Sequence, residues 1–329
     1  MITPDFRIVE AGDNKEASRK LAIENVGFVH RALGTSDWYF VSNLSGYAQD
    51  LRVQFAMGKK APQRWNPETG LVNETLVYQF IDLPGGKGSA TEVQLELDPF
   101  ESCFVVFPSL PYNPLVTRTN WPGPLKIEKA GEQIQVSGLL PLNGAYSLTT
   151  AGGKIHRFSI EGLPQPVTLA GPWRVTFDDG ATLTLPGLKS WTELPERNAF
   201  SGWAAYETDF EMEDLANDID WVLDLGVVHE TAEVALNGTQ LGIAWKGLRR
   251  VHCRGVLKSG HNHLKVDVAN LWINKTESLP KRDLKPLAET FGIRWGTDEE
   301  KMRPPLPPAG LLGPVRLIPY KRWTERFYT

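Results

Sequence analysis

Short stretches in which apolar and polar residues alternate make up most of the chain. Residues 49–57 (QDLRVQFAM) and 90–99 (ATEVQLELDP) alternate, while residues 101–109 (ESCFVVFPS) are almost continuously apolar. Alternation with a period of two predicts β-strands with one buried face. Segments rich in Gly and Pro separate the stretches at regular spacing, which is typical of antiparallel sandwiches. The sequence therefore predicts an all-β protein built from two antiparallel β-sandwich domains.

The order of these stretches also predicts the domains. Residues 1–26 form a linker with a short helix over 13–26, and residues 27–150 form a β-sandwich. About ten further strands with Gly and Pro turns between them follow in 151–329, and these fit a jelly roll of the galactose-binding-like type. A second short helix is expected over 283–293, where Pro286 limits its length.

Two details of the second domain are specific. Asn237-Gly238 stands between two strand-like stretches and predicts a tight hairpin turn. In the stretch HLKVDVANL the period of two places Leu264, Val266 and Val268 in the core, with Lys265 and its alternating neighbours on the outer face.

Composition narrows the class of ligand. The net charge is −4, from 35 basic and 39 acidic residues, and no basic block occurs, so nucleic acid is not expected as a partner. No apolar run is long enough to span a membrane. The chain contains 11 Trp. Indole faces suit the C–H faces of sugar rings, although Trp also packs well in sandwich cores.

Cysteine usage and the N-terminus bear on location. Cys103 lies in an apolar strand and Cys253 lies far from it, so we expect two free thiols rather than a disulfide. The first 20 residues contain no apolar region typical of a secretory signal. The chain is therefore either cytoplasmic or lacks the segment that carried a signal.

Four further stretches resemble segments of a known protein family, and they follow one another in the same order as in that family. They are FSGWAAYETDF (200–210), VLDLGVVHETAEVALNGTQLGIAWKG (222–247), LKSGHNHLKVDVANLWINK (257–275) and PPAGLLGPVRL (307–317). Together they resemble the sugar-binding jelly roll of family 2 glycoside hydrolases and, more closely, the C-terminal portion of family 106 α-L-rhamnosidases. Upstream, FVHRALGTSDWYFVSNLSG (28–46), RWNPETG (64–70) and PFESCFVVF (99–107) resemble the sandwich that follows the catalytic barrel there.

This resemblance implies a carbohydrate ligand from plant or algal polysaccharide, and a family that is often exported. In the family the catalytic carboxylates and a calcium site belong to a (β/α)8 barrel. A barrel needs about 250 residues, and the chain has no room for one, so no barrel residue is carried over. The partner implied is a carbohydrate, with the catalytic barrel on another chain as an alternative. No cofactor is expected.

Sugar binding needs an indole platform and a few fixed polar groups. The substrate-binding candidates are Trp245, Arg249, Asn270, Trp272, Asn274, Arg294 and Trp295. Asn270, Trp272 and Asn274 are expected on one strand face, with two amides flanking an indole. The alternative is that Trp245 and Trp272 pack in the core or against a missing barrel.

Catalysis by this chain alone would need two carboxyl groups at a defined separation. The candidates are Glu230, Glu207, Asp298 and Glu299, each of which also suits a solvated or ion-paired position. His261 and His263 stand two apart without a third ligand, so no metal site is predicted. Three functions stay open: a carbohydrate-binding module, a compact glycoside hydrolase with Glu230 as its first candidate, and a structural module that packs on a catalytic chain.

Overall fold

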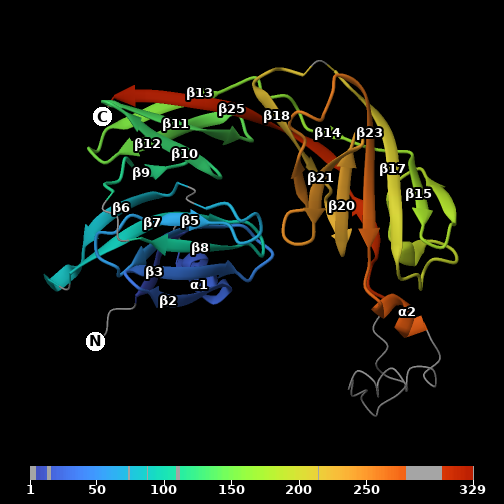
Figure 1. Ribbon diagram of the computed structural model, residues 1–329, viewed down its shortest axis with the longest axis horizontal. Helices are drawn as coiled ribbons and strands as arrows, with labels where there is room; N and C mark the ends of the chain where they lie inside the picture. Colours follow the sequence, from blue (N-terminus) through green and yellow to red (C-terminus); the bar gives the residue numbers. More distant parts are fainter. Residues whose placement is uncertain are drawn as a thin grey trace, which may run out of the picture. The chain divides into compact units, whose positions relative to one another are not determined.

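The computed structural model describes residues 5–12, 16–72, 75–86, 88–108, 112–213, 215–278 and 306–328. Nearly all elements in these ranges are β-strands, and their ladders are antiparallel (Figure 1). The prediction of an all-β, antiparallel sandwich protein is confirmed. Contacts divide the chain into two compact units. The first holds Met1–Pro164, Asp218–Asp220 and Pro319–Thr329, and the second holds Gln165–Asn217 and Trp221–Ile318.

The first unit begins with a sandwich of two four-stranded sheets. One sheet has the order β1 (Phe6–Ala11), β4 (Gln49–Phe55), β7 (Ser89–Leu97), β6 (Val77–Asp82), and the other has β2 (Val26–Leu33), β3 (Ser36–Asn43), β8 (Ser102–Phe107), β5 (Gln63–Trp65). Helix α1 (Glu16–Asn25) joins β1 to β2, within the range predicted to be helical. Strand β1 precedes it and pairs with β4, so the sandwich includes residues 6–11.

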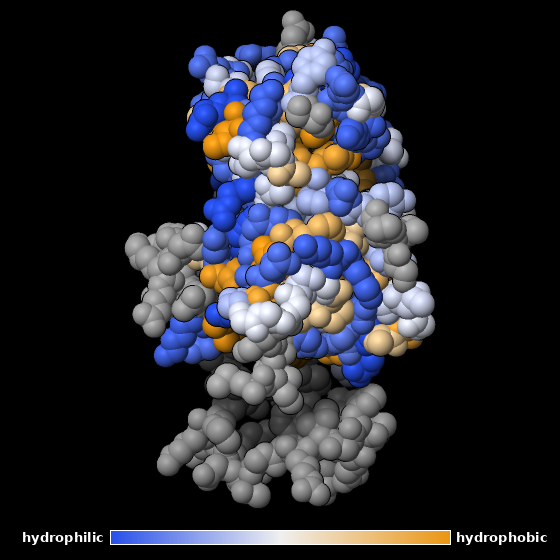
Figure 2. Space-filling view, turned by 90° about the vertical axis from the view of Figure 1, so that its left-hand side faces the viewer, coloured by the Kyte–Doolittle hydropathy of each residue, from blue (hydrophilic) through white to orange (hydrophobic). Residues whose placement is uncertain are grey.

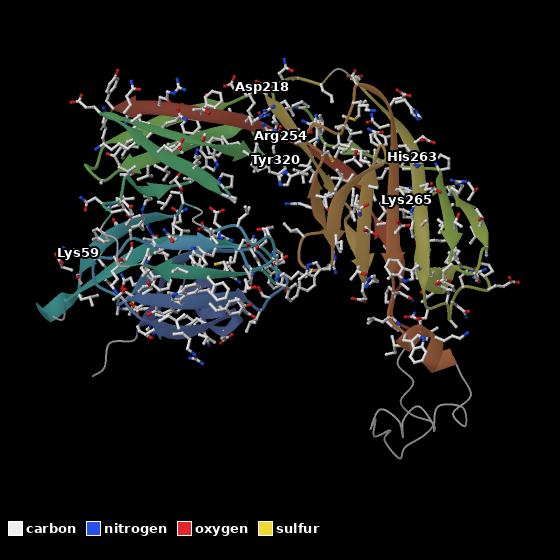
Figure 3. The ribbon with its side chains drawn as sticks, viewed as in Figure 1. Lys59, Asp218, Arg254, His263, Lys265 and Tyr320 are labelled. Carbon is white, nitrogen blue, oxygen red and sulfur yellow. The ribbon has the colours of Figure 1, made fainter. Side chains whose placement is uncertain are left out.

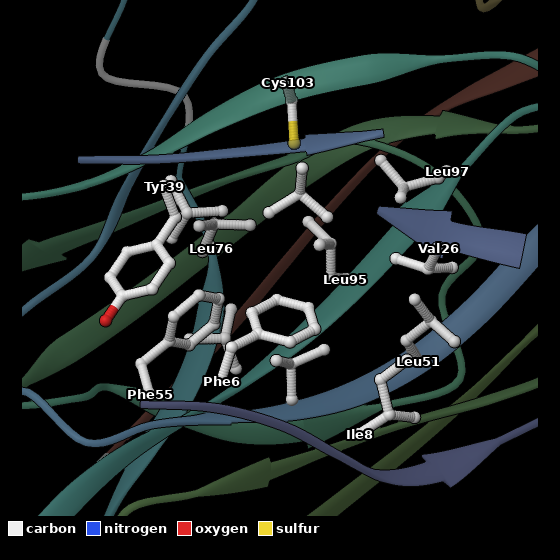
Figure 4. Close-up of a cluster of buried hydrophobic side chains, with 14 of the residues drawn as sticks. Phe6, Ile8, Val26, Tyr39, Leu51, Phe55, Leu76, Leu95, Leu97 and Cys103 are labelled. Atoms are coloured by element: carbon white, nitrogen blue, oxygen red, sulfur yellow. The ribbon is translucent and has the colours of Figure 1, made fainter. Parts of the chain in front are cut away.

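Aromatic and branched side chains fill this sandwich (Figure 4). Tyr39 and Phe55 are fully buried and meet edge to face, with ring centroids 4.8 Å apart. Leu51, Val53 and Phe55 alternate along β4 and point inward, as their period of two dictates. Cys103 is also completely buried here, and both it and Cys253 are free thiols, as predicted.

The first unit also contains a smaller pair of layers. A three-stranded sheet of β13 (Ile155–Ile160), β12 (Gly144–Thr150) and β9 (Val116–Thr119) covers β10 (Leu125–Ala130), β11 (Gln133–Leu140) and the end of β25 (Arg316–Tyr328). Trp121, Ile134 and Leu148 form their core at 1% exposure or less. Figure 2 shows one side of the molecule, on which hydrophobic patches lie among hydrophilic residues.

The second unit is organised around a six-stranded sheet. Its order is β16 (Thr182–Leu185), β15 (Trp173–Phe177), β17 (Trp203–Met212), β23 (Gly260–Ala269), β20 (Thr231–Leu236), β21 (Thr239–Ala244). Other strands of this unit are β14 (Val167–Thr168), β22 (Arg250–His252), β19 (Val227–His229) and β24 (Gly310–Gly313), together with most of β18 (Ile219–Asp224) and the start of β25. A 3-10 turn lies at Trp191–Glu193 in this unit, and another lies at Pro84–Gly86 in the first unit.

The specific predictions for this unit are confirmed in part. Leu264, Val266 and Val268 are fully buried along β23. Asn237 and Gly238 have φ angles of 51° and 77° and form the hairpin turn between β20 and β21. Gly310 has a φ of 95°, and a Cβ there would lie 2.5 Å from Trp191 Nε1 and from the Tyr206 hydroxyl, so only glycine fits.

One strand prediction is wrong. We expected residues 270–274 to continue the strand, with two amides and an indole on one face. Instead β23 ends at Ala269, and helix α2 (Ile273–Ser278) begins after a turn. The alternation of NLWIN matches a strand locally, but Asn270 and Asn274 each bind backbone carbonyls of other segments, which ends the strand. The helix expected over 283–293 lies outside the described residues.

Candidate functional site

Two exposed tryptophans stand at one end of the six-stranded sheet of the second unit. Trp203 opens β17 and is the register partner of Ala269, which is itself the partner of Thr231. Trp245 directly follows Ala244, which is paired with Ala232, so the register places Trp245 beside Thr231. We call Trp203, Ala269, Thr231 and Trp245 the tryptophan row. Three inter-strand steps of about 4.8 Å separate its ends by about 14 Å.

The row lies on the outer face of the sheet. Its neighbours Ala204 and Ala244 are buried, whereas Trp203 and Trp245 are 55% and 53% exposed. Because successive side chains in a strand point to opposite faces, the indoles lie on the side away from the core. The two residues between them are small, so the row forms a shallow trough with an indole at each end. The Lys246 ammonium lies 5.3 Å from the Trp245 ring centroid, a cation–π contact.

Side-chain hydrogen bonds hold the start of β17 in place. The Asn270 amide donates to the Phe200 carbonyl at 2.9 Å and accepts from the Gly202 amide at 3.0 Å. The Trp203 amide donates to Asp178 Oδ2 at 2.9 Å. Both ends of the Asn270 side chain are therefore used in positioning Trp203 against β23. The proposed role of Asn270 in orienting a ligand stays a prediction.

The next row along the same face is polar. Glu233 and Asp267 are direct register partners, and Glu233 is paired on its other side with Ile243, which is 64% exposed. Lys265 donates to Asp267 at 2.8 Å, and it projects from β23 together with His263 (Figure 3). Carboxylate acceptors thus lie one row away from the indoles. This combination suits hydroxyl groups on a flat ligand.

A second group of candidates lies beside the row. Glu230 directly precedes Thr231, and its amide donates to the Ala269 carbonyl at 2.8 Å. Burial lowers the pKa of the Arg249 guanidinium, and the nearby Glu230 carboxylate opposes that shift. Arg249 Nη1 is buried without a hydrogen-bond partner within the described residues. Glu230 also pairs loosely with His229 at 3.7 Å. The Arg249 guanidinium therefore lies within electrostatic range of the Glu230 carboxylate.

The other predicted binding residues are placed differently. Asn274 is 2% exposed and donates to the Pro307 carbonyl at 2.8 Å, so it fixes backbone. Trp272 is 59% exposed in the turn before α2. Arg294 and Trp295 lie outside the described residues. Of the predicted binding set, the structure brings Trp245, Arg249 and Asn270 to one end of the sheet.

The predicted catalytic carboxylates do not form a pair among the described residues. Glu207 accepts from Arg174 at 2.6 Å on β17 and is the register partner of Lys265. Lys265 lies four residues before Ala269 on β23, which is about 13 Å along the strand. The Glu230 amide binds the Ala269 carbonyl, so this distance also separates the backbone positions of Glu207 and Glu230. The backbone positions of the two residues are thus further apart than the carboxyl separation of about 5–9.5 Å that glycoside hydrolysis requires. Asp298 and Glu299 lie outside the described residues.

His261 and His263 lie close to carboxylates on the same outer face. His263 Nδ1 lies 2.9 Å from Asp209, and His261 lies 3.4 Å from Asp209 and 3.5 Å from Glu211. Within the part of the chain that the structure describes, no cluster of three or more His, Cys, Asp or Glu side chains is arranged to hold a metal ion. None of the helices in that part is long and apolar enough to cross a bilayer.

Sequence reasoning missed Trp203, Thr231, Glu233 and Asp267. A signal for the first was present, because Trp203 alternates with the buried Ala204 and Tyr206 at the start of a strand. The others could have been found by extending the hairpin register from Asn237-Gly238, which sets Thr231 beside Trp245. The pairing of β17 with β23, however, has no local signal in the sequence.

The comparisons with known proteins agree with this architecture. Residues 6–80 match the family model of the family 106 α-L-rhamnosidases. A protein of Formosa agariphila named as a candidate β-glucuronidase is 32% identical over 211 residues, which are 54% of this chain and 18% of that protein. A rhamnosidase structure from Novosphingobium sp. PP1Y superposes with a TM-score of 0.59 and 26% identity, over 96% of this chain and 25% of the other.

The chain is thus a glycoside-hydrolase-related β module that is similar to rhamnosidases over nearly its whole length. The resemblance noted from the sequence is confirmed. The chain spans a quarter or less of the length of these two relatives.

Proposed function

We propose that this chain binds a glycan and forms the carbohydrate-positioning part of a rhamnosidase-type glycoside hydrolase. The observation that carries the proposal is the tryptophan row, in which two exposed indoles flank two small residues on a rigid sheet. Sugar rings stack their C–H faces on indoles, while Thr231, Glu233 and Asp267 offer hydrogen-bonding groups to the hydroxyls. We propose rhamnose-containing plant or algal polysaccharide as the ligand class, and the similarity to a rhamnosidase structure supports rhamnose as the sugar.

The proposal includes the domain organisation. A sandwich over 27–150 and a galactose-binding-like jelly roll over 151–329 is supported by the contact boundary between Pro164 and Gln165. It is also supported by the six-stranded sheet that lies wholly in the second unit. In this division the tryptophan row belongs to the jelly roll.

Binding is favoured over hydrolysis because Glu230 and Glu207, the two predicted catalytic carboxylates among the described residues, are poorly placed to act as a pair. Glu230 and Glu207 are too far apart, and each is next to a cation. A screen of the purified chain against nitrophenyl glycosides tests the hydrolytic alternative. We expect no turnover above the uncatalysed rate. Hydrolysis that is abolished by Glu230→Gln would instead establish a compact glycosidase.

A purely structural role is the other alternative, because exposed indoles also suit a surface that packs on a further domain or chain. Isothermal titration of the chain with rhamnose-containing oligosaccharides separates the two. We expect saturable binding that Trp245→Ala weakens, whereas Tyr47→Ala, which removes a 69% exposed ring from the first unit, leaves it unchanged. Absence of binding to every oligosaccharide would favour the packing role.

A further inference from the structure

A polar cavity in the first unit is separate from the tryptophan row. It has a volume of about 420 Å³ and opens to solvent. One wall is the outer face of β1, β4 and β7, with Glu10, Asp50 and Arg52, and the other is the outer face of β9, β12 and β13, with Thr149 and Arg157. We propose that this cavity binds a neutral polyhydroxylated ligand, of which a pyranose ring is the matching size class.

The cavity is preformed because side chains link its two walls. Arg52, whose side chain is 5% exposed, donates through Nη2 to the Thr117 carbonyl at 2.7 Å. Gln94 donates to the Thr119 carbonyl at 3.0 Å and accepts from the Thr119 amide at 3.3 Å. These bonds tie β4 and β7 to β9. A ligand entering the cavity therefore meets walls that are already fixed, which lowers the entropy cost of binding.

Arg118 adds a further link at the rim. Its Nη2 lies 3.0 Å from Glu10 Oε1, so the pair joins β9 to β1. The two charges neutralise each other at the edge of the cavity. They also add a donor and an acceptor beside its opening.

Three side chains at the cavity remain unengaged. Within the described residues, the Asp50 carboxylate, the Thr149 hydroxyl and the Arg157 guanidinium make no hydrogen bond or ion pair. Asp50 only accepts, and Arg157 only donates, from opposite walls. A sugar hydroxyl both donates and accepts, so neighbouring hydroxyls of one ring can satisfy both walls. Ile155, 48% exposed, adds an apolar contact for the ring carbons.

The charges select a neutral ligand. The carboxylates of Glu10 and Asp50 repel anions such as uronates and sulfate, while the guanidinium groups of Arg52, Arg118 and Arg157 repel cations, so the lining charges nearly balance. Since none of the described residues that line the cavity is aromatic, the affinity should be in about the millimolar range.

The test uses the full chain carrying Trp203→Ala and Trp245→Ala, so that binding at the tryptophan row does not contribute. Methyl α-L-rhamnoside, methyl β-D-galactoside, galacturonate and sulfate are titrated separately, and the backbone amide resonances of Gly12 and Asn120, which line the cavity, are followed by NMR. We expect these resonances to shift saturably with a neutral glycoside and not with either anion.

Two further variants test the unengaged groups. Arg157→Ala and Thr149→Val should each weaken this binding at least threefold, and together at least tenfold. The matched control is Arg31→Ala, which removes an exposed arginine from β2 of the same unit. Three results would overturn the proposal: no saturable shift with either glycoside, stronger binding of galacturonate or sulfate, or unchanged affinity in the double variant. Each leaves the proposed role of the tryptophan row standing, because that row is absent from the protein tested.

Discussion

The second unit uses tryptophan in two opposite ways. Trp173 and Trp191 are completely buried, whereas Trp203 and Trp245 are more than half exposed. Trp191 packs edge to face on Phe177 and Phe200, with centroids 5.6 and 5.4 Å away, and donates to the Tyr206 hydroxyl. The row indoles have no such surroundings within the described residues. The comparison teaches that an indole count indicates function only after the buried rings have been set aside.

The largest expected effect is a difference in stability between variants of the buried tryptophans and variants of the exposed tryptophans. Trp191→Ala removes a buried ring and leaves the Tyr206 hydroxyl with the Leu311 amide as its remaining donor, so we expect a loss of about 3–5 kcal/mol in unfolding free energy. Trp245→Ala should change it by less than about 0.5 kcal/mol. Urea unfolding of both variants measures the difference. Equal destabilisation would show that Trp245 is a core residue.

A second prediction compares a partly buried carboxylate of the first unit, Glu96, with the carboxylates of the outer sheet face of the second unit. Burial raises the pKa of Glu96 to about 7, despite the hydrogen bond from the Gly123 amide. Because the folded-state pKa lies above the unfolded value, protonated Glu96 favours the fold. This stability is fully present below about pH 4.5 and is lost as the pH rises through about 7.

Glu96→Gln keeps an acceptor for Gly123 but removes the titration. Above pH 7 the variant should be more stable than the parent by up to about 3 kcal/mol, since each pKa unit corresponds to about 1.4 kcal/mol. Chemical unfolding at pH 5 and pH 8 checks this. A difference between the two proteins that does not change with pH would contradict the prediction.

A smaller effect on the unfolding free energy is expected from an ion pair on the outer sheet face of the second unit. Arg174 and Glu207 are 2.6 Å apart, but the Arg174 side chain is 62% exposed, so solvent screens the pair. Arg174→Ala should cost less than about 1 kcal/mol, and less still in high salt. Chemical unfolding of the parent and the variant at two ionic strengths measures this loss of stability. A loss of several kcal/mol would mean that this face is not a solvated surface.

The smallest effect concerns the thiols. Cys103 and Cys253 are buried and free, and burial raises the pKa of Cys253 to about 12, which keeps it unreactive. The melting temperature should therefore be the same with and without reductant. A drop of several degrees on reduction would reveal a disulfide.

Local pattern predicted most of the fold. The alternation of Leu264, Val266 and Val268 identified the buried face of β23, and Asn237-Gly238 identified its neighbouring hairpin, because period and turn chemistry are properties of a few adjacent residues. The strand end at Ala269 was missed. Hydrogen bonds from Asn270 and Asn274 to distant carbonyls decide it, and no local rule contains them.

The site was predicted less completely than the fold for the same reason. Trp245 and Arg249 were found because they are close in sequence to each other and to the hairpin. Trp203 joins them only through the pairing of β17 with β23 and of β23 with β20, which brings together residues more than 40 positions apart. Non-local strand pairing therefore creates the row, and only the structure reveals it.

The most direct test of the central claim is a binding cycle on the two row indoles. The parent, Trp203→Ala, Trp245→Ala and the double variant are titrated with one rhamnose-containing oligosaccharide, and their melting temperatures are recorded. We predict that each single change weakens binding about ten- to a hundredfold, equivalent to about 1–3 kcal/mol, while melting stays nearly constant. Unchanged affinity in the double variant, with the fold intact, would contradict the account.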